Sequence, residues 1–120
     1  MNAERCEVCW LPASKFPCSE RCRGLTEKKR QVRKLETALQ QAVLLAIGNL
    51  PPSSTCCPGV LAERLLKEQQ IVADARDSLA LLREIYFKLR AGGKIRFLQK
   101  GVVIPPGKDF FRGPFRLGKR

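Results

Sequence analysis

The sequence predicts a mainly α-helical protein with a small N-terminal cysteine module and a basic, largely irregular C-terminal tail. Three observations predict this class. Four cysteines lie in two close pairs near the N-terminus. Two stretches, 25–50 and 60–91, repeat apolar residues every seven positions. The remaining segment is rich in Lys, Arg, Gly and Pro. We therefore expect a zinc knuckle over residues 1–24, a helical hairpin over 25–92 and a tail over 93–120.

The cysteine module has the spacing of a metal site. Two residues separate Cys6 from Cys9, and three separate Cys18 from Cys22. Four thiols in two close pairs match a structural zinc ion, which takes four soft ligands from two tight turns. So small a unit cannot bury enough apolar surface to fold alone. We predict one Zn²⁺ on these four cysteines, with a structural role and no open coordination position.

The module also resembles known zinc modules. Its pattern is Cys-x2-Cys, a short proline-containing loop, and then Cys-Ser-x-x-Cys-Arg. This is similar to the first half of HIT-type and MYND-type zinc fingers, and to small bacterial cysteine-rich zinc proteins with a Cys-Ser-x-Arg-Cys second knuckle. The second quartet of ligands found in the finger families is missing. The resemblance implies a treble-clef arrangement in which the second pair of cysteines leads into a helix.

The two heptad stretches predict an antiparallel coiled-coil hairpin. Leu25, Val32 and Leu39 share one heptad position in the first helix. Three prolines and a glycine in residues 51–59 predict the turn between the helices. A two-helix hairpin leaves its apolar seam half exposed, so we expect a homodimer or a protein partner on it. The predicted partner interface consists of Leu65, Val72, Leu79, Leu82 and Tyr86.

The charge of the chain indicates an acidic partner. There are 23 Lys and Arg against 11 Asp and Glu, a net charge of +12, which favours binding to nucleic acid, to an acidic protein surface or to an anionic membrane. Of these three, we expect no membrane partner. In the tail, phenylalanines alternate with basic residues, as suits phosphate contact combined with base stacking. The predicted contact residues are Lys28, Lys29, Arg30, Arg33, Lys34, Lys108, Phe110, Phe111, Arg112, Phe115, Arg116, Lys119 and Arg120.

Two smaller features stand beside these. Residues 95–98 and 102–104 predict a short β-hairpin across Lys100 and Gly101. The adjacent thiols Cys56 and Cys57 lie in the proline-rich turn. Successive side chains diverge and do not readily bind one metal together, so we expect loop thiols; the alternative is that one of them completes or bridges a metal site.

Several functional classes are excluded or disfavoured. The chain has no histidine, which excludes histidine ligands and histidine acid–base catalysis. It has no phosphate-binding glycine loop and no nucleophile motif, so we expect no enzyme and no small-molecule substrate. No apolar run is long enough for a membrane span, and no secretory segment is recognisable. Six cysteines without such a segment favour an intracellular location, in the nucleus or cytoplasm.

Two functions remain open. The first is a non-enzymatic, zinc-stapled coiled-coil adaptor that assembles with protein partners and anchors an acidic or nucleic-acid surface through its tail. The second is a regulatory protein that binds RNA or DNA and is dimerised by the coiled coil. Acidic residues within 60–91 favour protein contact over DNA contact for the second helix.

Overall fold

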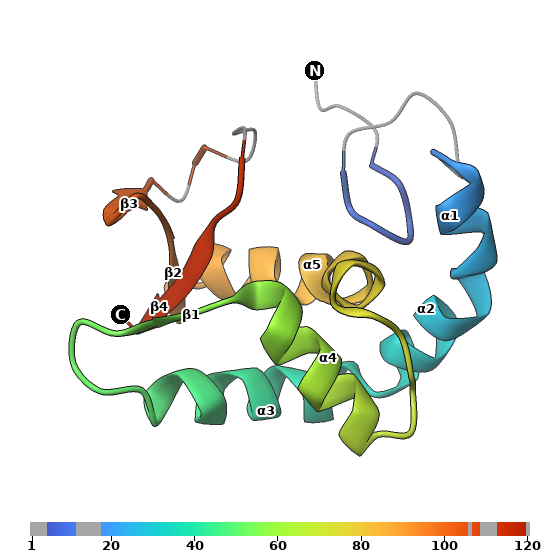
Figure 1. Cartoon of the computed structure of the whole chain (residues 1–120), viewed down its shortest axis with the longest axis horizontal. Helices are drawn as coiled ribbons and strands as arrows, with labels where there is room; N and C mark the ends of the chain where they lie inside the picture. Colours follow the sequence, from blue (N-terminus) through green and yellow to red (C-terminus); the bar gives the residue numbers. More distant parts are fainter. Residues whose placement is uncertain (1–4, 12–17, 106, 109–112, 120) are drawn as a thin grey trace.

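A computed structural model describes residues 5–11, 18–105, 107, 108 and 113–119. The elements follow in the order α1 (Glu20–Gly24), α2 (Thr26–Lys34), α3 (Glu36–Gly48), β1 (Thr55–Cys56), α4 (Pro58–Glu68), α5 (Ala75–Ala91), β2 (Ile95–Gln99), β3 (Val102–Ile104) and β4 (Arg116–Lys119). The sheet lies at one end of the molecule and α1 and α2 lie at the other, with α3, α4 and α5 between them (Figure 1). Within the described part of the chain, no helix combines the length and the apolar character needed to cross a membrane.

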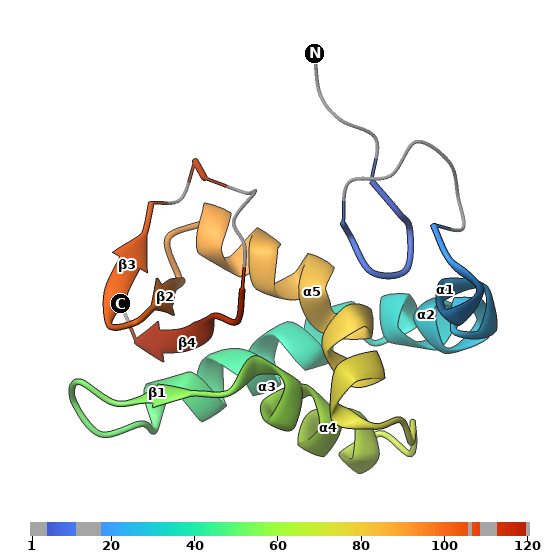
Figure 2. The same ribbon diagram turned by 45° about the horizontal axis from the view of Figure 1, so that its top comes forward.

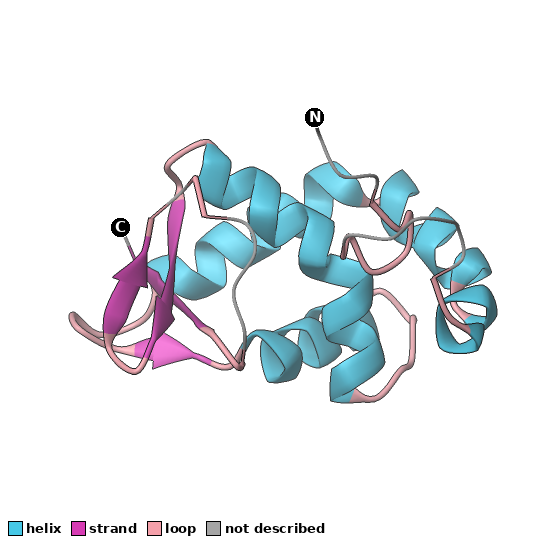
Figure 3. Ribbon diagram, turned by 90° about the horizontal axis from the view of Figure 1, so that it is seen from above, coloured by secondary structure: helices cyan, strands magenta, loops and turns pink. Residues whose placement is uncertain are grey.

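The predicted coiled-coil hairpin is wrong. The first heptad stretch, residues 25–50, is divided at Leu35 into α2 and α3, and residues 69–74 divide the second into α4 and α5. The helices pack at several angles instead of running as two long arms (Figure 3). A heptad pattern shows which side of a helix is apolar but does not identify the element that packs on it. In this chain several elements pack on the apolar side of α5, among them α3, α4 and β2, whereas a coiled coil would provide a single partner helix.

The C-terminal segment is not the largely irregular tail that the sequence predicted. Its strands join β1 in one antiparallel sheet of order β1-β4-β2-β3. Phe97 of β2 lies opposite Ile104 of β3 and Leu117 of β4. The predicted hairpin is confirmed, with Lys100 and Gly101 as its two-residue turn. Their φ values are 51° and 80°. Positive φ at both turn residues gives the backbone a twist that matches the twist of the two strands. Figure 2 shows β2, β3 and β4 beside the end of α5.

Helix α5 lies at the centre of the core. Leu81, Leu82 and Tyr86 are completely buried. The Tyr86 hydroxyl donates a 2.8 Å hydrogen bond to the carbonyl oxygen of Pro58 and so ties α5 to the start of α4. Burial raises the pKa of Tyr86 well above its ordinary value, so the hydroxyl keeps its proton and remains a donor.

This packing corrects the predicted partner interface. Leu65, Leu82 and Tyr86 are buried within the chain's own core, and Leu79 is half-buried. Only Val72 is strongly exposed, at 70%. The apolar face of the second heptad stretch is therefore covered mainly by the chain's own elements, and among the five predicted residues only Val72 remains open to a second chain.

The end of α4 explains why one predicted helix is two. The backbone N–H of Gln70 donates to the carbonyl of Lys67, and that of Ile71 donates to the carbonyl of Leu66, each at 2.9 Å. These paired bonds make a Schellman cap. Gln70 occupies the left-handed position with φ of 64°, a conformation that glycine usually supplies. The helix therefore ends without the glycine or proline that would reveal its end in the sequence.

Replacing Gln70 with glycine should raise the free energy of unfolding by about 0.5 kcal/mol. The left-handed conformation costs an ordinary residue about 1–2 kcal/mol, while glycine's greater freedom in the unfolded chain costs about 0.4–1 kcal/mol. Gln69→Gly is the matched control: its φ is −97°, so glycine relieves no strain there and should destabilise. Urea unfolding of both variants checks this, and equal losses at the two positions would contradict it.

Candidate metal centre

The four cysteines of the N-terminal module meet in space. Their sulfur atoms all lie within 4.8 Å of one another. The Cys18 sulfur lies 3.5 Å from that of Cys9 and 3.3 Å from that of Cys22. These separations exceed a disulfide bond of about 2.05 Å. They approach the spacing of about 3.8 Å that Zn–S bonds of about 2.3 Å give in a tetrahedron. The prediction that these cysteines form one possible metal site is confirmed.

Local backbone structure positions both pairs. The backbone N–H of Trp10 donates a 2.9 Å hydrogen bond to the carbonyl of Cys6, which closes a tight turn around the first pair. The Ser19 hydroxyl caps α1 by accepting from the backbone N–H of Cys22 at 3.2 Å. This cap starts the helix immediately after Cys18 and places Cys22 in its first turn, so the two side chains face one another.

The cluster is poorly suited to holding its own negative charge. Cys6, Cys9 and Cys22 are at most 4% exposed, whereas Cys18 is exposed. Burial works against ionisation of Cys6, but hydrogen bonds from Cys9 and its neighbours outweigh burial and lower the pKa of that thiol to about 6. Burial raises the pKa of Cys9 and of Cys22. Ionisation of Cys9 and Cys22 is therefore disfavoured in the cluster alone, and a bound divalent cation would remove that restriction.

Arg83 brings positive charge from α5 to this centre, and the sequence analysis did not identify it. Its Nη1 donates a 3.0 Å hydrogen bond to the carbonyl of Cys9. Burial lowers the pKa of the Arg83 guanidinium, while the neighbouring cysteine sulfurs act in the opposite direction. Four thiolates around a divalent cation carry a net charge of −2, which an adjacent guanidinium partly neutralises. No local spacing links this arginine to the cysteines, so only the fold reveals it.

Further contacts hold the cysteine module against α5. The Arg5 guanidinium donates to the Trp10 carbonyl at 2.8 Å and lies 5.3 Å from the Trp10 ring and 5.4 Å from the Phe87 ring. Arg21 of α1 forms a 3.0 Å ion pair with Asp77 near the start of α5. The module therefore packs along the same helix that organises the core.

A buried ion-pair network extends this contact through α2. Lys29 is 3% exposed, and its ammonium lies 3.3 Å from the Glu84 carboxylate and 3.1 Å from the Leu81 carbonyl. The same carboxylate lies 3.1 Å from Lys88 and 3.7 Å from Arg33. Two of the basic residues predicted to contact nucleic acid, Lys29 and Arg33, thus face α5. Because Lys29 is buried, it is not available to a nucleic acid in this structure.

The other predicted contact residues have varied positions. Arg30, Lys34, Lys108, Arg116 and Lys119 are exposed, and Lys28 is half-buried. Phe115 is only 8% exposed and packs against Phe97 with ring centroids 4.7 Å apart, so it is not free to stack on a base. Phe110, Phe111, Arg112 and Arg120 lie outside the described residues.

We expect Arg83→Gln to weaken metal retention by about 10- to 100-fold, the usual effect of removing a partner outside the ligand set. The variant loses the charge beside the thiolates and the bond to the Cys9 carbonyl. Competition with a chromogenic zinc chelator measures the change. Arg76→Gln removes an exposed charge from the same helix and should leave retention unchanged. Equal retention in both variants would contradict a role for Arg83.

Comparison with known proteins gives one match. Residues 30–120 match the family described as "Protein of unknown function (DUF3253)". All four cysteines of the candidate metal centre precede the matched residues, so the family assigns them no role. No curated protein and no solved structure matches the chain.

Proposed function

The chain belongs to the DUF3253 family, and we propose that it is a non-enzymatic nucleic-acid-binding protein whose N-terminal module is held by one structural Zn²⁺. Charge on the C-terminal strands is the observation that carries the proposal. Lys94, Arg96, Lys100, Arg116 and Lys119 are all exposed, and the described residues after Gly93 include no Asp or Glu. Exposed cations without acidic neighbours attract polyanions.

The chemistry of the ligand set supports zinc as the metal. Four thiolates form a soft set, which suits Zn²⁺ better than Mg²⁺ or Ca²⁺. Four protein ligands complete a tetrahedral site and leave no position for a water or a substrate. We therefore propose a structural role, in which the metal fixes the knuckle and α1 while Arg5, Arg21 and Arg83 attach them to α5 through Phe87, Asp77 and the Cys9 carbonyl respectively.

The order of the elements gives secondary support for nucleic-acid binding. Helix α4, the turn at 69–74 and α5 form a helix–turn–helix, and an antiparallel β-hairpin follows it. Helix–turn–helix units are common in DNA-binding proteins. The turn at 69–74 is longer than the three or four residues typical of such units. The similarity to helix–turn–helix proteins is one of fold alone, and fold does not determine function. The charge distribution therefore remains the main support.

The adaptor hypothesis loses its original basis. It depended on a coiled-coil seam that a partner would cover, and the seam residues Leu65, Leu82 and Tyr86 fill the core instead. Nucleic acid is consequently the partner that we propose.

Fluorescence anisotropy with labelled oligonucleotides tests this function. The zinc-loaded full chain should bind, and the logarithm of its affinity should fall linearly with the logarithm of salt concentration. Three phosphate contacts to a single strand would give a slope of about −2, since each contributes about 0.7. Absence of binding at low salt, or affinity that does not change with salt, would refute the proposal.

A further inference from the structure

The second helix of the helix–turn–helix is closed off by the cysteine module. Along α5, only Arg76, Lys88 and Ala91 are exposed. The knuckle, α1 and α2 cover the rest of its outer side through contacts such as the ion pairs Arg21–Asp77 and Lys29–Glu84. A helix that reads the major groove must present several side chains to base edges. Helix α5 cannot do so while the module is in place, so a nucleic acid must bind elsewhere.

The outer face of the sheet offers a basic surface. In β2, Ile95 and Phe97 are buried, whereas Arg96 between them is exposed. Because strand side chains alternate between faces, Lys94, Arg96 and Leu98 share the outer face. The register places Leu98 between Arg116 of β4 and Val103 of β3. We call the set Lys94, Arg96, Leu98, Lys100, Val103 and Arg116 the basic sheet face.

Two features order the side chains on this face. Gly118 lies opposite Arg96 and also opposite Thr55, and a Cβ at Gly118 would come within 2.7 Å of the Leu98 side chain. Arg116 is held in place because its Nε and Nη2 donate to the Thr55 hydroxyl and carbonyl at 2.6 Å and 3.3 Å. A guanidinium has five donor hydrogens, so Arg116 retains donors for an anion.

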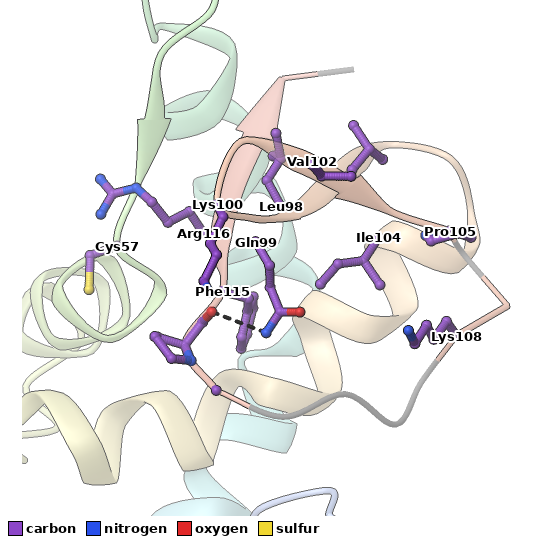
Figure 4. Close-up of a pocket in the computed structure, with 13 residues that line it drawn as sticks. Cys57, Leu98, Gln99, Lys100, Val102, Ile104, Pro105, Lys108, Phe115 and Arg116 are labelled. Carbon is purple, nitrogen blue, oxygen red and sulfur yellow. Dashed lines mark hydrogen bonds between the residues drawn. The ribbon is translucent and has the colours of Figure 1, made fainter.

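A groove adjoins the basic sheet face. It has a volume of about 910 Å³ and lies between the β2–β3 hairpin and residues 113–115, which directly precede β4. Its apolar lining includes Leu98, Val103 and Pro105, and Lys100, Lys108 and Arg116 add positive charge. Figure 4 shows these groups around the hairpin, with the Gln99 side-chain amide donating to the Pro114 carbonyl at 3.3 Å across the groove wall.

Positive charge on this face is not neutralised within the described structure. On the helices, Arg21, Lys29, Arg30 and Lys88 each form an ion pair with Asp or Glu. Lys94, Arg96 and Lys100 form none with any described residue. Among the described residues, the sheet end of the molecule therefore carries positive charge that is available to an external anion.

We infer that the basic sheet face and its groove bind single-stranded nucleic acid, with the phosphates on Arg96, Lys100 and Arg116 and the bases against Leu98, Val103 and Pro105. This inference rests on the proposed function and names its site. A duplex presents phosphates and sugars outward and would leave the apolar lining of the groove without a partner. A single strand offers both chemistries, as in grooves that combine cations along the backbone with apolar contacts to bases.

A pair of charge variants tests the inference against the helix–turn–helix. Arg96→Gln with Lys100→Gln removes two cations from the sheet face. Lys67→Gln with Arg76→Gln removes two exposed cations from α4 and α5. Each zinc-loaded full chain is titrated into a labelled oligothymidylate of about 16 nucleotides, a length within the range that single-strand-binding domains occupy. Thermal unfolding confirms that both variants remain folded.

The sheet variant should bind the oligothymidylate on the order of tenfold more weakly, with a salt slope smaller by about 1.4, because two phosphate contacts of about 0.7 each are lost. The helix variant should match the wild type. Equal effects of the two variants, a larger effect of the helix variant, or tighter binding of a duplex of the same length would overturn the inference. So would displacement of the oligothymidylate by polyglutamate at equal charge, which would indicate an acidic protein ligand.

The same titrations separate this inference from the proposed function. If the wild-type chain binds no oligonucleotide, the proposed function and the inference both fail. If the wild type binds and the sheet variant binds equally well, nucleic-acid binding stands and only the assignment to the basic sheet face fails.

Discussion

Replacing Cys22 with serine should abolish metal binding and release residues 5–11 and 18–24 from α5, while α3, α4, α5 and the sheet stay folded. The module has few apolar side chains of its own, so we expect a bound metal to supply most of its stability. Structural zinc contributes about 10–16 kcal/mol in isolated finger peptides, far more than the module's polar contacts with α5. The larger core depends on Leu39, Leu66 and Phe97, which lie in other elements.

Elemental analysis and hydrogen exchange measure the two effects separately. Zinc content should fall from about one equivalent to near zero, as a Cys₄ site requires all its ligands. Amide protection should disappear in α1 and persist in α5. Cys57→Ser removes an exposed thiol outside the cluster and should change neither. If metal-free protein kept full protection in α1, packing rather than metal would hold the module.

The clustering of the four cysteines in the candidate metal centre could be predicted from sequence, because its determinants are local. A tight turn brings Cys6 and Cys9 together, and a helix start capped by Ser19 positions Cys18 and Cys22. Spacing along the chain specifies each pair. The β2–β3 hairpin was predictable for the same reason, since a Lys-Gly turn joins two short apolar segments.

Longer-range features gave no such signal. Strand β4 contains Gly118 and two cations, so in isolation it reads as irregular chain. It becomes a strand by pairing with β1 and β2, which lie far away in sequence. The heptad pattern correctly identified an apolar side around Leu82, but no pattern in one segment states which other segments cover that side. The coiled-coil prediction failed at that step.

The end of α4 shows a different limit. Gly and Pro usually mark helix ends because they tolerate or impose the backbone conformations found there. Gln70 adopts the left-handed conformation with the support of the two capping bonds and the buried side chain of Ile71. Tertiary packing therefore determines where this helix ends, although glutamine itself disfavours the left-handed conformation that Gln70 adopts.

Replacing Glu84 with glutamine should lower the free energy of unfolding by about 3–5 kcal/mol, the usual effect of removing one partner of a buried ion pair. The Glu84 side chain is 9% exposed and the Lys29 side chain is 4% exposed. Glutamine would keep the shape but leave the Lys29 ammonium buried without a counter-charge. Because Glu84 also contacts Lys88 and Arg33, the loss should loosen α2 from α5.

Glu27→Gln is the matched control. Glu27 also forms an ion pair, with Arg30, but the two side chains are 72% and 69% exposed. Loss of this ion pair should therefore lower the free energy of unfolding by only about 0.3–0.5 kcal/mol. Urea unfolding of the two variants gives the comparison, and similar losses would show that burial adds nothing to the Glu84 pair. Adding Lys29→Met to Glu84→Gln should recover part of the stability, since it removes the isolated charge.

Acid unfolding gives an independent measure of the same network. Burial works to raise the pKa of Glu84, but Lys29 and Lys88 outweigh it and hold that pKa below its ordinary value of 4.5. A carboxyl with a lowered pKa in the folded state contributes stability that is fully present above its unfolded pKa. That contribution is lost as pH falls below 4.5 and through the folded value. Stability of the wild type should therefore fall more steeply with acid than that of Glu84→Gln, which has no proton to gain at this position. Parallel acid profiles would show that the Glu84 carboxylate gains nothing from its three cations.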